Sequence, residues 1–149
     1  MAETNKDYIL QVRNLKKYFP IEKTLFGKPI TYLKAVDDVS FDVERGKTIG
    51  IIGESGCGKT TLGRTILKLY DPDGGSIIYD GNDITNLKRN QMIKYRTQIQ
   101  LIFQDPYSSL PPRMTIGNII SEAVKVHKVV PENEVSSYVK DMMQKCGLK

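Results

Sequence analysis

The chain has 149 residues, about the length of one domain, and its 40% hydrophobic and 26% charged content is typical of a folded globular protein. No apolar run approaches the roughly 20 residues that a membrane-spanning helix needs, and two cysteines are too few for a disulfide framework. The net charge of +5 is distributed among acidic residues and short basic pairs, which argues against a nucleic-acid-binding arm. Because the N-terminus (MAETNKDYIL) has no apolar signal-peptide region, we expect a cytoplasmic protein.

The N-terminal part of the chain reads mainly as strands. Residues 8–14 (YILQVRN) alternate apolar and polar side chains and predict a strand, and we expect Pro20 to end the extended segment. Residues 21–29 (IEKTLFGKP) are polar and contain Gly and Pro, which predicts a surface loop. Residues 32–43 return to strand alternation.

A glycine-rich segment follows, between an apolar run and a helix-like run. Residues 47–52 (KTIGII) predict a buried strand, and residues 61–70 (TLGRTILKLY) predict a helix with its apolar side chains on one face. Residues 53–60 (GESGCGKT) match G-x-x-x-x-G-K-[ST] at every fixed position, which is the P-loop pattern. Glycines let successive backbone N–H groups face one concavity, and the following helix adds the positive end of its dipole. The sequence therefore predicts a polyphosphate site.

The residue types of this loop suggest individual roles. Lys59 would reach the β- and γ-phosphates of a nucleotide as a point charge, and Thr60 would offer its hydroxyl to a Mg²⁺ ion that bridges them. The candidate nucleotide-binding residues of the loop are Gly53, Glu54, Ser55, Gly56, Cys57, Gly58, Lys59, Thr60 and Thr61.

Beyond the loop, the sequence predicts both strands and a helix up to about residue 103, and only helices after residue 116. Residues 77–79 predict a short strand closed by an Asp-Gly turn, residues 86–96 predict a helix, and residues 98–103 (QIQLIF) predict a strand. Apolar residues then recur at helical spacing over 116–127 and 135–146, so we expect two helices, the second ending at a glycine.

A P-loop alone does not say which class of nucleotide-binding protein is present. A GTPase should add a guanine-reading N-K-x-D element, which does not occur in the sequence. A small kinase would place an Asp at the end of an apolar strand to hold Mg²⁺. The two candidates fit poorly, because Asp80 runs straight into a glycine turn and Asp105 is separated from its apolar run by Gln104.

The surroundings of Gln104 are more specific. Residues 101–115 (LIFQDPYSSLPPRMT) resemble the Q-loop of ABC transporter ATPases, and more narrowly that of the oligopeptide/dipeptide importer branch, where the usual run is FQDPYxSLNPRMT. Three further segments are similar to sequences of the same branch, namely NLKKYFP (14–20), AVDDVSFDV (35–43) and GESGCGKTTLGRTILKLY (53–70). The resemblance therefore covers nearly the whole chain. The departures are a Thr-Thr pair after Lys59 in place of Ser-Thr, and Pro111 in place of Asn.

The resemblance implies an α/β P-loop NTPase fold of the ABC type with an antiparallel β part at its N-terminus. Residues 1–114 would form the β-rich part and P-loop core, and residues 115–149 the start of the helical subdomain, which contacts transmembrane subunits. Tyr18 matches the aromatic residue that stacks on adenine, although on its own it reads equally well as a core tyrosine at a strand end. Gln104 matches the glutamine that touches Mg²⁺ and the attacking water, so Lys59 and Gln104 are the candidate catalytic residues.

Several parts that the family uses for hydrolysis are not found in the sequence. The signature LSGGQ is absent, no apolar strand ends in Asp-Glu, and the only histidine, His127, lies in a helical stripe. We therefore expect the N-terminal portion of an ATP-binding subunit, which binds Mg-ATP but does not turn it over alone.

The resemblance also implies partners and a location. The partners would be transmembrane permease subunits, a second related ATPase and, indirectly, an extracellular substrate-binding protein, at the cytoplasmic face of the cell membrane and without nucleic acid. The alternatives are a soluble ABC-type ATPase that acts on nucleic acid or in assembly, and a fragment that only binds.

Overall fold

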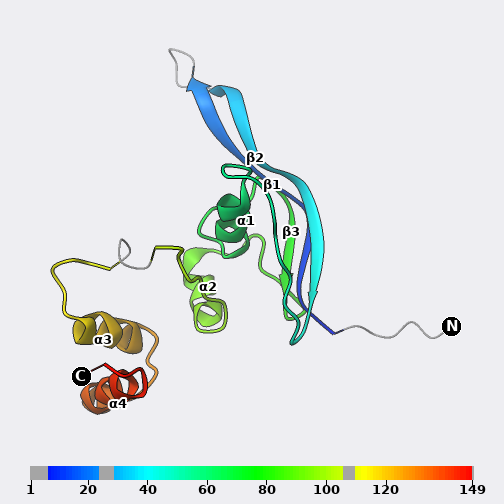
Figure 1. Ribbon diagram of the computed structural model, residues 1–149. Coiled ribbons are helices and arrows are strands. Elements are labelled where there is room, and N and C mark those ends of the chain that lie inside the picture. The colour runs from blue at the N-terminus through cyan, green and yellow to red at the C-terminus, as the bar shows by residue number, and fades with distance from the viewer. Residues whose placement is uncertain (1–6, 24–28, 106–109, 149) are drawn as a thin grey trace. The chain divides into compact units, whose positions relative to one another are not determined.

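The computed structural model describes residues 7–23, 29–105 and 110–148 (Figure 1). The chain divides into two compact units, Met1–Met92 and Ile93–Lys149. Within the described ranges, no helix is both long enough and apolar enough to cross a membrane. The predicted boundary at residue 114 stays a prediction.

The first unit is built on a four-stranded antiparallel sheet with the strand order β2-β1-β3-β4. The strands β1 (Tyr8–Lys23) and β2 (Pro29–Glu44) form a long ribbon that is visible in blue and cyan in Figure 1. The shorter β3 (Gly74–Tyr79) pairs with the other side of β1, and β4 (Asn82–Asp83) pairs with β3. The expected antiparallel β part is therefore confirmed.

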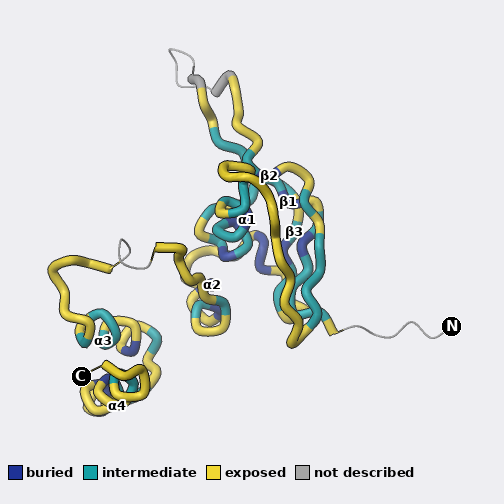
Figure 2. The backbone as a smooth tube through the Cα atoms, viewed as in Figure 1, coloured by how far each residue is buried: buried dark blue, intermediate teal, exposed yellow. Residues whose placement is uncertain are grey.

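A bulge in β1 brings the core side chains of the sheet to one face. Val12 and Leu15 are fully buried although they lie an odd number of positions apart, and the pairing with β2 shifts register between them. Asn14, with φ of 47°, supplies the extra residue that this requires. Gly75 faces the bulge, where a Cβ would lie 2.4 Å from the carbonyl oxygen of Arg13. Figure 2 shows buried residues of this unit on the strands, on α1 and on α2.

Pro20 does not end the strand, contrary to the prediction. It lies inside β1 and pairs with Tyr32, so both strands extend into the predicted loop 21–29, of which residues 24–28 lie outside the described ranges. The strand β3 pairs with β1 only as far as Lys16. At Pro20, β1 therefore has β2 as its one described neighbour, and a proline is tolerated where one side of a strand needs no N–H donor.

Two predicted strands, 47–52 and 98–103, are wrong, because neither run is in a strand. Their side chains are exposed, with Ile52 at 97% and Ile102 at 93% of full exposure. A strand exists only with a partner across a hydrogen-bonded ladder, and an apolar strand of a parallel core needs covering layers on both faces. The described residues provide neither for these two runs.

The helices of the mixed part are shorter than predicted. The helix α1 (Lys59–Ile66) ends at a turn in which Lys68 has φ of 54°, so Leu69 is half-exposed and does not continue an apolar face. Leu62 and Thr65 are its buried residues. The helix α2 (Arg89–Arg96) begins later than the predicted residue 86.

The second unit contains the two predicted C-terminal helices. The helices α3 (Ile116–Val126) and α4 (Val135–Lys145) are linked by a 3-10 turn, Glu132–Glu134, and pack through Val124, Val135 and Val139. The Thr115 hydroxyl caps α3 by accepting the N–H of Asn118 at 3.3 Å. Gly147, with φ of 72°, ends α4 as predicted, and His127 is a half-buried residue at the end of α3.

Candidate nucleotide-binding site

The predicted P-loop, residues 53–60, turns directly into α1. Two of its glycines have left-handed backbone angles, with φ of 82° at Gly56 and 97° at Gly58. Gly58 is also packed against β2, because a Cβ built there would lie 2.1 Å from the carbonyl oxygen of Ala35. A side chain at Gly58 is therefore disfavoured by both conformation and space. The sheet fixes the end of the loop from which α1 begins.

Lys59, the first residue of α1, folds back over the loop. Its ammonium donates hydrogen bonds to the carbonyl oxygens of Gly53 and Glu54, each at 2.6 Å, and lies 3.5 Å from the Cys57 sulfur. The positive charge is thus held at the mouth of the glycine-rich turn. Phosphate oxygens would compete with these carbonyls for the same ammonium, and a charged acceptor forms the stronger hydrogen bond.

The start of α1 favours an anion. The first N–H groups of a helix have no partner within the helix and carry the positive end of the dipole, and the first turn of α1 has no acidic residue to compete for them. Thr60 is exposed next to Lys59, whereas Thr61 is half-buried and its carbonyl accepts the Thr65 hydroxyl at 2.8 Å. The remaining loop residues Gly53, Glu54, Ser55, Gly56 and Cys57 are all exposed.

The two predicted magnesium ligands lie in different units. A hydroxyl and an amide oxygen are hard ligands of the kind that Mg²⁺ accepts, so the chemistry of Thr60 and Gln104 fits this ion. Thr60 stands at the P-loop, but Gln104 is exposed in a segment of the second unit without regular secondary structure. Residues 106–109 of the predicted Q-loop lie outside the described ranges.

Tyr18 lies near the P-loop within the first unit. It pairs across the ribbon with Lys34, the residue next to the Ala35 whose carbonyl faces Gly58. Its ring is half-buried, and its hydroxyl donates a hydrogen bond to Asp37, so it is not a member of the apolar core. The hydrogen bond to Asp37 raises the pKa of Tyr18 to about 12.

The sequence reading missed the side chains that surround Tyr18. Asp37 and Lys34 contact it from β2, and Asp73 accepts its backbone N–H at 2.7 Å. Asp73 also pairs with Lys17 at 3.0 Å. These contacts depend on the register of a bulged ribbon and on a turn far along the chain, so no local pattern indicates them.

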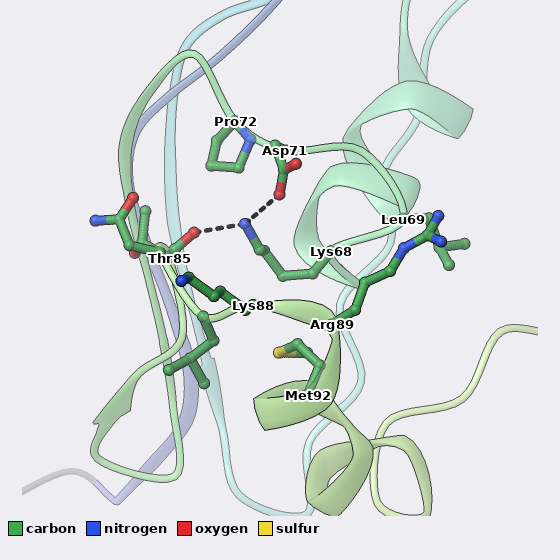
Figure 3. A pocket seen from close by; sticks show the side chains of 10 residues that line it. Lys68, Leu69, Asp71, Pro72, Thr85, Lys88, Arg89 and Met92 are labelled. Carbon is green, nitrogen blue, oxygen red and sulfur yellow. Dashed lines mark hydrogen bonds and ion pairs between the residues drawn. The ribbon is translucent and has the colours of Figure 1, made fainter.

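A separate cavity of about 480 Å³ lies between the segment after α1 and the start of α2 (Figure 3). At its wall the almost fully buried Lys68 ammonium bridges Asp71 at 2.7 Å and the Thr85 carbonyl at 2.6 Å. This ammonium holds the pKa of Asp71 below its usual range. No predicted nucleotide-binding residue lines the cavity, and Lys68 ties two loops of the first unit together.

A glycine-rich turn that leads into a helix beside a sheet, with a lysine over the turn, defines the class of P-loop nucleotide-binding proteins. The family described as ABC transporter matches residues 36–149. The chain therefore belongs to the ABC transporter family, as the resemblance implied.

Two relatives of the chain are named for peptide transport. The chain is 44% identical over 149 residues to the oligopeptide transport ATP-binding protein AppF of Bacillus subtilis (strain 168), covering 99% of this chain and 45% of that protein. It is 42% identical over 141 residues to the dipeptide transport ATP-binding protein DppF of Haemophilus influenzae, covering 95% of this chain and 43% of that protein. The chain thus spans less than half the length of these relatives.

Solved structures of ATP-binding cassettes share the fold. A dimeric post-hydrolysis state of the cassette MJ0796, bound to ADP and Pi, aligns with 94% of this chain and 58% of its own, with a TM-score of 0.73 at 19% identity. The ABC transporter component cbiO1 of Clostridium perfringens aligns over 97% of this chain and 52% of its own, with a TM-score of 0.66 at 26% identity. The expected fold class is therefore confirmed.

Proposed function

We propose that this chain is the nucleotide-binding part of the ATP-binding subunit of a peptide importer. The observation that carries the proposal is the P-loop geometry, in which Gly58 is held against β2 and the Lys59 ammonium lies over the turn. The relatives AppF and DppF, named for oligopeptide and dipeptide transport, support the class of cargo.

Different residues of the first unit bind different parts of the nucleotide. Lys59 and the N–H groups at the start of α1 bind the phosphates, while the Thr60 hydroxyl ligates the Mg²⁺ that neutralises them. Tyr18, on the ribbon beside Gly58, stacks on the adenine. Stacking is tolerant of the base, because every base has a π-face.

Gln104 would be a ligand of Mg²⁺ and would orient the attacking water, as the resemblance implies. Phosphoryl transfer depends on positioning and charge neutralisation, and it also needs a second metal ligand and a base for the water. The sequence contains no apolar strand ending in Asp-Glu and no LSGGQ signature. The isolated chain therefore binds Mg-ATP without sustained hydrolysis, and transport is powered when two related ATPase subunits close on ATP beside the permease.

Phosphate release and partner capture test this function together. We expect no steady phosphate release from the 149-residue chain, and we expect permease subunits to co-purify with it from detergent-solubilised membranes. Steady release that Lys59→Ala abolishes would contradict the absence of turnover. Retention of DNA instead, with an affinity that falls steeply with salt, would favour a soluble ATPase that acts on nucleic acid.

A further inference from the structure

Tyr18 is held by two side chains of the neighbouring strand. One carboxylate oxygen of Asp37 accepts the Tyr18 hydroxyl, and the other lies 3.1 Å from the Lys34 ammonium. The same ammonium lies over the Tyr18 ring, 5.6 Å from its centroid, as a cation–π contact requires. The three residues close a cycle in which each touches both others.

This cluster is attached to the P-loop through the backbone of β2. Lys34 and Asp37 flank Ala35 and the buried Val36, and the Ala35 carbonyl is the atom against which Gly58 packs. The segment that fixes the end of the P-loop therefore also carries both side chains that fix the tyrosine.

We propose that Asp37 and Lys34 are positioning residues for Tyr18, so that base binding in this chain depends on the tyrosine hydroxyl as well as on its ring. The proposal rests on the proposed function, in which Tyr18 stacks on the base. The ammonium covers one face of the ring, and the proposal places the base on the opposite face. The hydroxyl bond stops the ring from rotating about its side-chain bonds, and an aligned ring costs a ligand less ordering entropy.

A purely stacking tyrosine and an anchored tyrosine differ in their response to Tyr18→Phe. Phenylalanine retains the ring, so stacking alone predicts unchanged affinity for ATP. Loss of the anchor predicts ATP binding weaker by roughly three- to tenfold, because the ligand must then order the Tyr18 side chain itself. Asp37→Asn should act in the same direction, and the double variant should bind no more weakly than the weaker single variant.

The experiment is calorimetric titration of the 149-residue chain and these variants with Mg-ATP and with inorganic triphosphate. Triphosphate has no base, so its affinity should be unchanged in Tyr18→Phe and Asp37→Asn, which also shows that the variants are folded. Asp38→Asn is the matched control, because it removes the same charge one residue away and asparagine tolerates its φ of 61°.

The outcomes separate the two proposals. Weakening of ATP alone in both variants, with Asp38→Asn like the parent, supports the positioning role. Parental ATP affinity in both variants, with weakening in Tyr18→Ala, overturns the positioning role and leaves ATP binding intact. Failure of the parent to bind either probe overturns both proposals.

The pKa of the Tyr18 hydroxyl provides a second test, because a tyrosine that only stacks on the base has no reason for a raised pKa. Asp37 raises the pKa of Tyr18 to about 12, so the parent-minus-Tyr18→Phe absorbance difference should show almost no tyrosinate between pH 9 and pH 11. In the Asp37→Asn background the pKa of Tyr18 should fall toward 10, with burial and the charges of Asp38 and Asp73 still raising it, so the same difference should reveal tyrosinate at a lower pH than in the parent. A Tyr18 that already titrates near pH 10 in the parent would overturn the anchor.

Discussion

Lys59 and Cys57 show how closely the P-loop is folded at the residue scale. The Lys59 ammonium binds the Gly53 and Glu54 carbonyls, and the exposed Cys57 sulfur lies 3.5 Å from it. The thiol thus borders the space that phosphates would take. A group added to this sulfur would stand beside the ammonium that binds them.

Alkylation of Cys57 should therefore block nucleotide binding, and Mg-ATP should slow the alkylation. Labelling with N-ethylmaleimide, quantified by peptide mass spectrometry with and without Mg-ATP, measures both rates. Cys146 is the internal control, since it is also exposed but lies in the second unit. Equal labelling rates of Cys57 in the presence and absence of Mg-ATP would contradict this reading.

Gly58→Ala should abolish ATP binding, because alanine adds both a strained backbone at φ of 97° and a Cβ 2.1 Å from the Ala35 carbonyl. Gly46→Ala is the matched control: Gly46 has φ of 72°, but a Cβ there meets nothing within 4 Å. It should cost only the backbone strain, about 1 kcal/mol of stability, and leave ATP affinity unchanged. Equal ATP affinities of the two variants in calorimetric titration would show that contact with β2 does not shape the loop.

At the scale of residues, the parts of the site that could be predicted are those whose pattern lies in one contiguous stretch of sequence. The P-loop residues carry a contiguous pattern, so the glycine-rich turn and the start of a helix beside it could be predicted from the sequence. Asp37 and Lys34 were not, because their contact with Tyr18 depends on a cross-strand register that shifts at several bulges. The resemblance supplied Tyr18, but only the ribbon shows what holds it.

At the scale of elements, sequence patterns predicted the helices, whose hydrogen bonds join residues close together in the chain. The helices α3 and α4 were predicted from periodicity and the end of α4 from Gly147, whereas the Thr115 cap was found only in the structure. The runs 47–52 and 98–103 have equally apolar patterns, yet they form no strand, because a strand needs a neighbour that its own residues cannot provide. The prediction that Pro20 ends the strand was wrong for the same reason, because β1 can contain a proline there only since its pairing with β3 stops at Lys16.

The two-helix packing of the second unit can be tested at Val139. Val139→Ala removes methyl groups from a side chain that is 4% exposed, and should lower the stability of the helical hairpin by about 1–3 kcal/mol. Val126→Ala is the control, because Val126 is 63% exposed and gains the same helix propensity. Urea unfolding followed by circular dichroism should separate the two variants, and equal midpoints would show that Val139 is not a core residue.

At the scale of the whole molecule, the predicted nucleotide-binding residues and the predicted catalytic glutamine lie in different units. The first unit brings Lys59, Thr60, Gly58 and Tyr18 onto one framework, whereas Gln104 belongs to the second unit. The chain also spans only 45% of the oligopeptide relative. Nucleotide binding is therefore the activity that the described residues can support directly, and turnover would require further groups around the γ-phosphate.

The most direct test of this account is the equilibrium affinity of the 149-residue chain and its Lys59→Ala variant for Mg-ATP, measured by calorimetric titration. The account predicts saturable binding to a single site in the parent chain. It predicts affinity at least roughly tenfold weaker in Lys59→Ala, because a charge-assisted contact to the phosphates is lost. Equal affinities of the two chains, or no binding by the parent, would contradict it.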